Sequence, residues 1–336
     1  MLSLRNKQLQ LLHILLLVVF VSCSAGSKLT KKMENEKIIQ LADPTIFYSK
    51  GIYYLYGTGG LKHTDGFAVY TSKNLRNWRG PVGNEGYAFR KGDGYGNGKF
   101  WAPQVFSYNS KFYMAYAASE HIGIAVGESP LGPFKQKTSS PVSEDTKQID
   151  PFVFIDADGK KYLYYVVVAN GGNRIFVAEM NDDMLTVKKE TATLCIEATD
   201  TWENTAKDNW SVAEGPTVIK HKNLYYLVYS ANHFKWADYA VGYAVSESPY
   251  GPWKKYEGNP IIHKSITGQN GSGHGDLIRG KKNELLYVFH THHSPEKIAP
   301  RKTAIIKLNF TKDEKTGSEI LRADAKSFSY LYQTTP

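Results

Sequence analysis

The chain has 336 residues, a formal net charge of +9 at pH 7 and a hydrophobic fraction of 42%. That fraction, with only 22% charged residues, excludes an intrinsically disordered chain. Two cysteines exclude a disulfide framework and a cysteine-rich zinc domain. The 23 Tyr, 15 Phe and 29 Gly favour strands and turns, in a chain long enough for two ordinary domains or one large all-β domain.

The first 22 residues predict a signal peptide. Arg5 and Lys7 precede an apolar run over 9–21, which is shorter than the roughly 20 residues of a membrane-spanning helix. The end of this run, Phe20-Val21-Ser22-Cys23, resembles a bacterial lipobox with Phe where Leu is usual, and would make Cys23 a lipidated N-terminus. Ordinary secretory cleavage is the alternative. Residues 23–37 would form a flexible, lipid-anchored tether, because they are polar and rich in Lys.

Two segments further along align without gaps and indicate an internal repeat. Residues 123–134 (GIAVGESPLGPF) and 242–253 (GYAVSESPYGPW) share eight of twelve residues at an offset of 119 positions. Residues 67–78 are a weaker relative. In each segment an apolar run ends at a turn that contains serine, and an aromatic residue follows. Self-similarity of this kind is typical of repeat architectures.

A second recurring feature is a proline that opens a run of apolar and aromatic residues, as the first position of a strand allows. The four copies are Asp43-Pro44, Ala102-Pro103, Asp150-Pro151 and Gly215-Pro216, and a fifth unit without proline starts at Gly275. Each unit holds about four short strands within roughly 50 to 60 residues, without helical periodicity. The sequence therefore predicts an all-β fold, a single-domain five-bladed β-propeller over 38–336, rather than a β-sandwich or an alternating α/β fold.

Acidic residues precede three of these prolines, namely Asp43, Asp150 and Glu214. The innermost strands of a propeller surround its central channel, so residues at the same end of these strands should converge. Three acids at one mouth repel each other, and at least one pKa should rise. A protonated acid and an ionised base across a sugar hydrolyse glycosidic bonds. Turn chemistry alone would explain any one of these acid–proline motifs.

Together these landmarks resemble glycoside hydrolase family 43, whose members share a five-bladed β-propeller. The resemblance covers residues 41–308, and its short motifs are specific through their order and spacing. They are Ala42-Asp43-Pro44, Trp101-Ala102-Pro103, Ile149-Asp150-Pro151, Glu214-Gly215-Pro216, Gly273-His274-Gly275 and Pro300-Arg301-Lys302-Thr303-Ala304. One departure is Gln104, where the family often has Asp, and we expect it to have a local structural effect.

The resemblance implies a catalytic role for each acid. Asp43 would be the general base that activates water, and Glu214 the general acid that protonates the departing glycosidic oxygen. Asp150 would raise the pKa of Glu214 and hold it in position. Family members invert the anomeric centre, which requires base and acid to lie about 6.5–9.5 Å apart with water between them. We therefore expect residues 38–336 to form the catalytic domain of an inverting glycoside hydrolase.

The same resemblance implies three substrate-binding residues. His274 matches a histidine on the floor of the pocket, which in some members is linked through waters to a metal ion. Arg301 would bind sugar hydroxyls or tune the acid, and Trp101 would stack on a sugar face. No cofactor is expected to be required and no direct metal ligand is predicted. The presence of a calcium ion in the central channel, linked to His274 through waters, is left open by the sequence.

Other reactive side chains carry less specific signals. His290, His292 and His293 suggest a metal cluster, but no Cys accompanies them, and hydrogen-bonding or pocket-lining histidines are favoured over zinc. Cys195 lies in a predicted strand over 193–196 and is expected to be a buried, inert thiol. Long segments at 80–99 and 200–211, the second with two Trp, could enclose an exo-acting pocket or line an open cleft.

The sugar is the least defined part of the prediction. Family members cleave α-L-arabinofuranosides, β-D-xylosides, arabinan or galactan. The chain ends soon after the fifth unit, without the appended β-sandwich of many β-xylosidases of the family. This favours an α-L-arabinofuranosidase acting on arabinan, arabinoxylan or arabinogalactan. A β-D-xylosidase, an exo- or endo-acting arabinanase and a galactanase are the alternatives.

Functions of other classes can also be weighed on the sequence. A carbohydrate-binding propeller without catalysis is the non-enzyme alternative, and the presence of all three acids argues against it. A WD-type interaction propeller would carry Trp-Asp dipeptides, and the chain has none. A fructan-cleaving propeller would show Asn-Asp-Pro and Glu-Cys-Pro, where this chain has Ala42-Asp43-Pro44 and Glu214-Gly215-Pro216.

The expected partners follow from these predictions. They are an oligo- or polysaccharide substrate and the lipid anchor of a bacterial outer membrane. Basic residues do not form a stripe interleaved with aromatic residues, so no nucleic-acid partner is expected. We expect an exported monomer, either an outer-membrane lipoprotein on the periplasmic or outer surface or a secreted or periplasmic protein.

Overall fold

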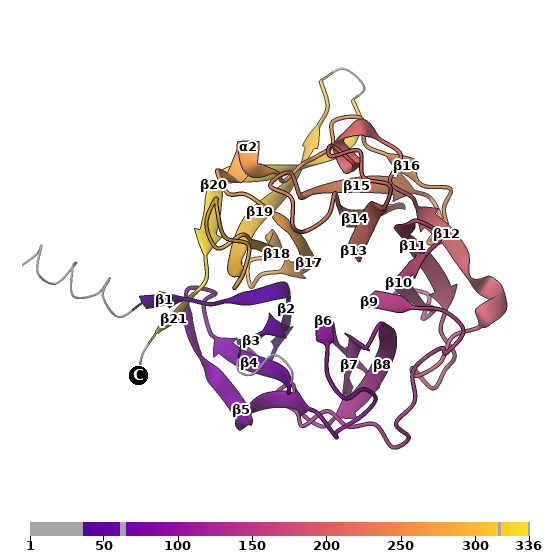
Figure 1. The fold of residues 1–336 in the computed structure, drawn as a ribbon, viewed down its shortest axis with the longest axis vertical. Helices are drawn as coiled ribbons and strands as arrows, with labels where there is room; N and C mark the ends of the chain where they lie inside the picture. The colour runs from indigo at the N-terminus through magenta and orange to yellow at the C-terminus, as the bar shows by residue number, and fades with distance from the viewer. Residues whose placement is uncertain (1–35, 61–64, 315–316, 335–336) are drawn as a thin grey trace, which may run out of the picture.

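Five groups of antiparallel strands are arranged around a central axis like the blades of a propeller (Figure 1). The computed structural model describes residues 36–60, 65–314 and 317–334. In each blade the first strand lies nearest the axis and later strands lie further out. The predicted all-β, five-bladed propeller is confirmed. The predicted signal peptide, Cys23 and the tether up to residue 35 lie outside the described residues.

The blades follow one another in chain order. The first contains β2 (Leu41–Ser49), β3 (Ile52–Gly59), β4 (Gly66–Ser72) and β5 (Asn77–Arg90). The second contains β6 (Phe100–Tyr108), β7 (Lys111–Ala118) and β8 (His121–Gly127). The third contains β9 (Gln148–Ile155), β10 (Lys161–Ala169), β11 (Gly172–Glu179) and β12 (Thr193–Ile196). The fourth contains β13 (Ser211–His221), β14 (Leu224–Ala231), β15 (Ala240–Ser246) and β16 (Lys254–Lys255). The fifth contains β17 (Gly273–Arg279), β18 (Leu285–Thr291), β19 (Lys302–Lys312) and β20 (Glu319–Tyr330).

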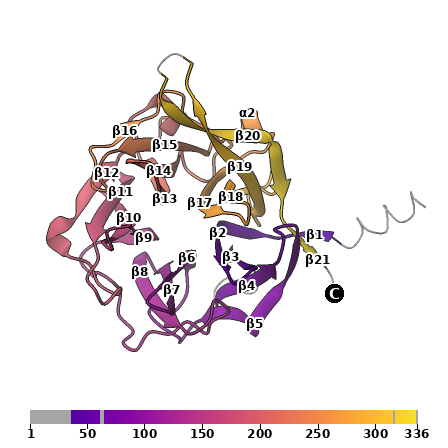
Figure 2. The same cartoon turned by 180° about the vertical axis from the view of Figure 1, so that it is seen from behind.

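The two ends of the described chain close the ring together. Strand β1 (Glu36–Ile38) pairs with β21 (Tyr332–Thr334), and β21 pairs with β5 of the first blade. Figure 2 shows these strands side by side from behind. Ile39 adds hydrogen bonds to the backbone of Leu331 and Thr303 at 2.8 and 2.9 Å, and so joins the first blade to the fifth. Strand β1 starts at Glu36, two residues before the domain boundary expected at 38.

Short helices occupy connections between strands, the first within the third blade and the other two between blades. They are η1 (Lys189–Thr191), η2 (Thr201–Glu203) and α2 (Lys264–Thr267). No helix in the described part of the chain has the length and apolar character needed to cross a membrane. The expectation of a long loop over 80–99 is wrong in its first half, because β5 continues to Arg90. Register shifts and left-handed glycines such as Gly80 let this strand bend while it stays paired with β4.

The aromatic excess of the sequence fills the spaces between blades. In β3, Tyr54 and Tyr56 belong to the cluster between the first and second blades, while Tyr53 and Leu55 belong to the cluster between the first and fifth. Successive side chains of a strand point to opposite faces, so each inner strand supplies two neighbouring cores. A strand that is buried on both faces needs apolar residues at every position, which explains runs that do not alternate with polar residues.

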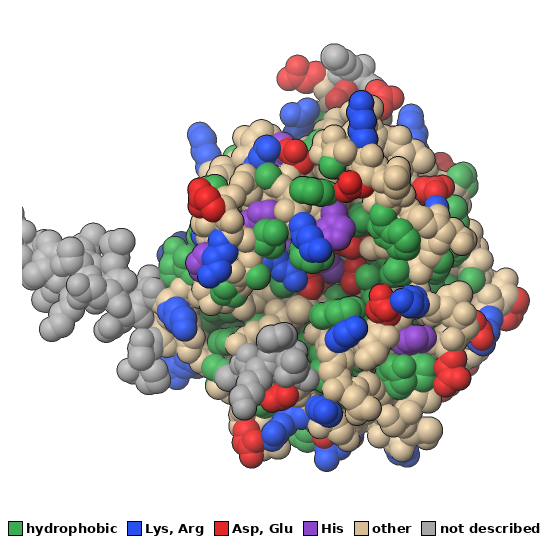
Figure 3. Space-filling model, viewed as in Figure 1, with side chains coloured by type: hydrophobic (Ala, Val, Ile, Leu, Met, Phe, Trp, Pro, Cys, Tyr) green, Lys and Arg blue, Asp and Glu red, His purple; other side chains and the backbone are tan. Residues whose placement is uncertain are grey.

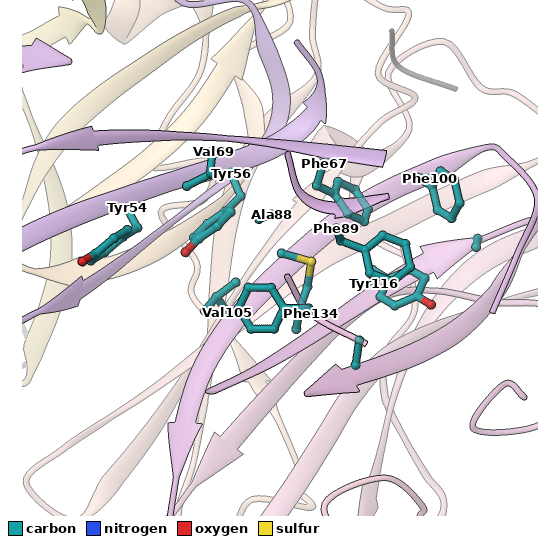
Figure 4. Packing of buried hydrophobic residues seen from close by; sticks show 13 residues of the cluster. Tyr54, Tyr56, Phe67, Val69, Ala88, Phe89, Phe100, Val105, Tyr116 and Phe134 are labelled. Carbon is teal, nitrogen blue, oxygen red and sulfur yellow. The ribbon is translucent and has the colours of Figure 1, made fainter. Parts of the chain in front are cut away.

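The core between the first two blades is built largely of aromatic rings (Figure 4). Phe89 is completely buried, and its ring centroid lies 4.5 Å from that of Tyr116 and 5.5 Å from that of Phe100. Phe67 lies 6.0 Å from Phe89 on the same cluster. Contacts of this kind join strands from two blades, so this cluster holds neighbouring sheets together as well as filling space.

Phe89→Ala should lower the free energy of unfolding by about 3–5 kcal/mol, because it opens a cavity at this junction. Chemical denaturation followed by tryptophan fluorescence measures the loss. Leu194→Ala in β12 is a matched control, since Leu194 is 45% exposed and its truncation should change stability by less than about 0.5 kcal/mol. Equal losses in the two variants would contradict this account of the core.

Candidate active site

Each innermost strand contains a β-bulge where one residue adopts a left-handed backbone. The residues are Asp43, Ala102, Asp150, Gly215 and His274, with φ between +42° and +58°. The pairing with the next strand shifts register at each of them. A bulge changes the direction of a side chain, and L residues seldom adopt this conformation. The same local feature thus turns one residue of every blade toward the axis, where all five line one narrow cavity.

The bulges bring the three predicted acids together. The exposed fractions of Asp43, Asp150 and Glu214 are 8%, 6% and 8%. The backbone N–H of Gly215 donates to Oδ2 of Asp150 at 3.1 Å, which ties β13 to β9. His274 lies between two of the acids, with Nδ1 3.5 Å from Oδ1 of Asp43 and 3.8 Å from Oδ2 of Asp150. Acidic and histidine side chains meet near the centre of the face shown in Figure 3.

Asp43 is held in its ionised form by its neighbours. Burial acts to raise its pKa, but Arg301 and His274 outweigh burial and hold the pKa of Asp43 well below its usual range. Nη1 of Arg301 donates to Oδ1 of Asp43 at 3.2 Å. The Asp43 backbone N–H donates to Nδ1 of His290 at 3.1 Å. An ionised carboxylate with fixed geometry can accept a proton from water, as a general base must.

His290 supports this carboxylate from below the surface. Its side chain is completely buried, and burial together with the Arg301 guanidinium lowers the pKa of His290 to about 3. The ring is therefore neutral at pH 7 and acts as a hydrogen-bond partner rather than as a counter-ion. Of the three histidines that suggested a metal cluster, this one touches a predicted site residue.

Asp150 and Glu214 have the opposite electrostatic environment. Burial and the negative charge of Asp43 raise the pKa of Asp150 to about 8. Burial and the charge of Asp150 raise the pKa of Glu214 to about 7. Glu214 therefore keeps a proton up to neutral pH, while Asp43 does not. Paired acids whose environments push their pKa values apart can perform acid and base catalysis in one site.

Two residues beside Glu214 were missed in the sequence. The hydroxyl of Tyr239 donates to Oε1 of Glu214 at 2.7 Å, and Nδ2 of Asn173 donates to Oε2 at 3.0 Å. They lie 25 and 41 residues from Glu214 along the chain, outside the repeated motifs. Neither has a counterpart at the proline landmarks, so the repeat pattern contained no signal for them.

The other predicted substrate-binding residues occupy different parts of the site. Arg301 contacts Asp43, and its guanidinium lies 4.8 Å from the ring centroid of Phe234. Trp101 directly precedes the bulge of β6, at the place that Glu214 takes in β13, and is half-buried. Gln104 lies two residues after the same bulge, where its amide donates to and accepts from the backbone of Val153 at 3.2 and 2.7 Å.

The remaining reactive residues make ordinary contacts. His292 and His293 bond to the backbone oxygens of Phe234 and Pro300 at 2.8 and 3.1 Å. Within the described residues, no three His, Cys, Asp or Glu side chains are grouped so that they could hold a metal ion. Cys195 lies in β12 as predicted, but it is half-buried rather than fully buried. Burial raises the pKa of its thiol to about 12, which disfavours the reactive thiolate.

A calcium ion, which the sequence left open for the channel, prefers six to eight oxygen ligands. Asp276 is the acid that faces the channel below the bulges, and its two carboxylate oxygens accept from the hydroxyls of Thr45 and Thr217 at 2.6 and 2.8 Å. Burial raises the pKa of Asp276, which disfavours a free anion. Both carboxylate oxygens of Asp276 are thus engaged by hydroxyl groups, and no step below depends on a metal.

A propeller with an ionised and a protonated carboxyl at one mouth has the machinery of a glycoside hydrolase. Residues 38–316 match the sequence model of glycosyl hydrolases family 43, and the chain belongs to this family. Its solved relatives include an endo-1,4-β-xylanase from Bacteroides thetaiotaomicron, 38% identical with a TM-score of 0.81, with 89% of this chain and 99% of the other covered. A thermostable family-43 glycoside hydrolase is 37% identical with a TM-score of 0.74, covering 88% and 95%.

Curated relatives are more distant. A xylosidase/arabinosidase from Bacteroides ovatus is 24% identical, with 74% of this chain and 85% of the relative covered. Xylosidase/arabinosidase 43A from Humicola insolens is 31% identical over 46% of this chain. A β-D-galactofuranosidase from Aspergillus niger is 24% identical over 57% of this chain. In the last two comparisons the match spans 56% of the relative's own length.

Proposed function

We propose that this chain is an inverting glycosidase that removes arabinofuranose from plant cell-wall polysaccharide, an α-L-arabinofuranosidase. The observation that carries the proposal is the opposite protonation of Asp43 and Glu214 in one buried site. An enzyme that inverts the anomeric centre needs both forms at once. Pentose sugars are supported by relatives whose names include xylosidase/arabinosidase and α-L-arabinofuranosidase.

In the proposed reaction two protons move in one step. Asp43 takes a proton from a water molecule as the water oxygen attacks the anomeric carbon. Glu214 gives its proton to the departing glycosidic oxygen, and the bond between that oxygen and the anomeric carbon breaks. Arg301 steadies Asp43, while Asp150 keeps the pKa of Glu214 high until the substrate arrives. The product sugar has the anomeric configuration opposite to that of the substrate.

A β-D-xylosidase is the second candidate function. The endo-1,4-β-xylanase from Bacteroides thetaiotaomicron and the β-xylosidase from Xylanibacter ruminicola favour a xylose-containing substrate. The two sugars are both pentoses, and the three acids serve either equally. The choice therefore depends on residues that contact the sugar, among which we place Trp101, His274 and Arg301.

A panel of nitrophenyl glycosides, with arabinan, arabinoxylan and xylan, tests the proposal, with product anomers followed by proton NMR. We expect turnover of the α-L-arabinofuranoside, with the inverted anomer formed first. Faster turnover of the β-D-xyloside would favour the second candidate. Retention of configuration would contradict an inverting hydrolase. Sugar binding without turnover would also contradict it and would favour a carbohydrate-binding propeller.

The pH dependence of kcat/KM should be bell-shaped, with its alkaline limb near pH 7. Glu214 must be protonated to act, so activity falls as the pH rises through its pKa of about 7. Asp43 must be ionised, so the acidic limb lies below the ordinary aspartate value of roughly 3.9. Asp150→Asn removes the carboxyl group whose ionisation opposes that of Glu214, and should move the alkaline limb to lower pH. An unchanged limb would contradict the role given to Asp150.

We also propose that the protein is exported and acts as a monomer. Relatives from Cellvibrio japonicus and Bacillus subtilis are named as extracellular enzymes, which supports export. Lipidation at Cys23 would add a membrane anchor to the N-terminus. Labelling with radioactive palmitate, compared between the full chain and its Cys23→Ser variant, tests the anchor.

A further inference from the structure

A chain of two hydrogen bonds leads from an exposed tryptophan to the proposed general acid. Nε1 of Trp210 donates to Oδ1 of Asn173 at 3.0 Å, and Nδ2 of Asn173 donates to Oε2 of Glu214 at 3.0 Å. Trp210 is 43% exposed, while Asn173 and Glu214 are each 8% exposed. The chain thus runs from the surface into the buried site, and the reaction as described above uses neither Trp210 nor Asn173.

The backbone places Asn173 opposite the start of β13. Strands β11 and β13 pair in parallel through Gly172 with Ser211 and Asn173 with Val212, which joins the third blade to the fourth. A further bond runs from the N–H of Ser211 to the carbonyl of Gly171 at 3.3 Å. The position of Asn173 beside the acid is therefore set by main-chain pairing between blades.

The orientation of the Asn173 amide is decided by Trp210. An indole N–H can donate a hydrogen bond but cannot accept one, so the atom that faces it must be the amide oxygen. The amide nitrogen must then face Glu214, to which it donates. Without the indole N–H, the amide could turn over and present its oxygen to Glu214 instead.

We propose that Trp210 and Asn173 are positioning residues for the general acid, in which the indole N–H keeps the amide donating to Glu214. This inference rests on the proposed function. A donated hydrogen bond favours the carboxylate form, so the pair opposes burial and lets the acid release its proton. A reversed amide would accept the proton of Glu214 and hold it away from the leaving oxygen.

Other charged or titratable groups also act on Glu214. Asp150 on β9 and Asp43 on β2 raise its pKa, whereas His274 on β17 lowers it. The hydroxyl of Tyr239, which precedes β15, donates to its other oxygen and lowers the pKa as well. Because Trp210→Phe leaves these four residues in place, a change in the titration of Glu214 reports the two hydrogen bonds from Trp210 through Asn173 to Glu214. We call this pair of bonds the relay.

The direct test is a carbon-13 NMR titration of the protein labelled at its Glu carboxyl groups. Loss of one signal in Glu214→Gln assigns Glu214. Trp210→Phe keeps an aromatic ring and removes the N–H, so the pKa of Glu214 should move upward, and Asn173→Ala should move it in the same direction. The double variant should shift it no further than Asn173→Ala alone, because the two residues act in series.

Trp236→Phe is the matched control. Trp236 is 44% exposed, and its Nε1 donates to Oδ2 of Asp208 at 2.8 Å, with no bond to Asn173 or Glu214. This variant should leave the Glu214 titration unchanged. An unshifted Glu214 in Trp210→Phe, or an equal shift in Trp236→Phe, would overturn the relay whether or not the protein hydrolyses any glycoside.

Kinetics then connects the relay to catalysis. Trp210→Phe should lower kcat on the order of tenfold for an arabino-oligosaccharide and leave kcat for a dinitrophenyl arabinofuranoside nearly unchanged, since dinitrophenolate leaves without protonation. The alkaline limb of the profile should move to higher pH. A rise in KM alone, equal for both substrates, would overturn the relay and would indicate that the Trp210 ring only contacts the substrate. Shifted titration with no turnover by the wild type would refute the proposed function and leave the relay supported.

Discussion

Glu214→Gln should lower kcat for an oligosaccharide by about 10²–10⁴-fold, because glutamine cannot donate a proton to the leaving oxygen. The substitution keeps the size of the side chain. Its amide can still accept from Nδ2 of Asn173 and donate to the hydroxyl of Tyr239, both of which contact Glu214 in the native protein. The buried site therefore stays hydrogen-bonded, and the lost activity reports chemistry rather than unfolding.

The leaving group supplies the control for this prediction. A dinitrophenyl glycoside has a leaving group that needs no proton, so Glu214→Gln should slow it far less than the oligosaccharide. The alkaline limb near pH 7 should also disappear, because the group that titrates there is gone. Equal losses on both substrates, or a preserved limb, would show that another residue is the acid.

Asp43→Asn should lower kcat by a similar factor of about 10²–10⁴, but on every substrate alike, since activation of water does not depend on the leaving group. Steady-state rates on the same pair of substrates measure this contrast. The acidic limb of the pH profile should vanish. A loss confined to the oligosaccharide would contradict Asp43 as the base.

The Asp43→Gly variant allows an experiment in which an added anion restores turnover, and the backbone conformation at residue 43 suits glycine. Residue 43 has φ of +47°, a conformation that glycine adopts more readily than other residues. Removal of the carboxylate leaves space near Arg301 for a small anion. Added azide should restore turnover and yield a glycosyl azide of inverted configuration, seen by NMR. Retained configuration in that product would place Asp43 on the wrong face of the sugar.

The charge of Asp43 should also contribute to stability in a pH-dependent way. Its pKa is lowered in the folded protein, so its stabilising contribution is present above the unfolded value of roughly 3.9 and is lost as the pH falls toward the folded value. The wild type should therefore lose more stability than Asp43→Asn when acidified below about pH 4. Thermal melts at several pH values compare the two proteins.

Much of the fold was predictable because the blades repeat. Matched prolines marked the innermost strands of four blades, and the acids beside them were predicted to converge at the channel. The position of His274 in the same series was not recognised from the repeats, because glycine follows it where the other blades have proline. In the structure it has the same left-handed bulge as Asp43 and Asp150.

The electrostatic differences between the acids could not be predicted from their motifs. Asp43 and Asp150 have the same Asp-Pro motif and the same bulge, yet their pKa values are shifted in opposite directions. Arg301, which comes from the segment before β19, forms its hydrogen bond with Asp43 and lowers the pKa of that acid most, whereas burial and the charge of Asp43 raise the pKa of Asp150. Contacts between residues so far apart in the chain depend on how the fifth blade closes against the first.

The sequence by itself determined the repeated strands and the acids of family 43, because these features are local and recur in register. Only the tertiary structure decided which acid is ionised, which partner holds each one, and that Trp210 and Asn173 reach Glu214. The physical reason is that burial, charge and hydrogen bonding depend on atoms brought together across blades. A local pattern shows where a carboxylate occurs, but its surroundings decide what it can do.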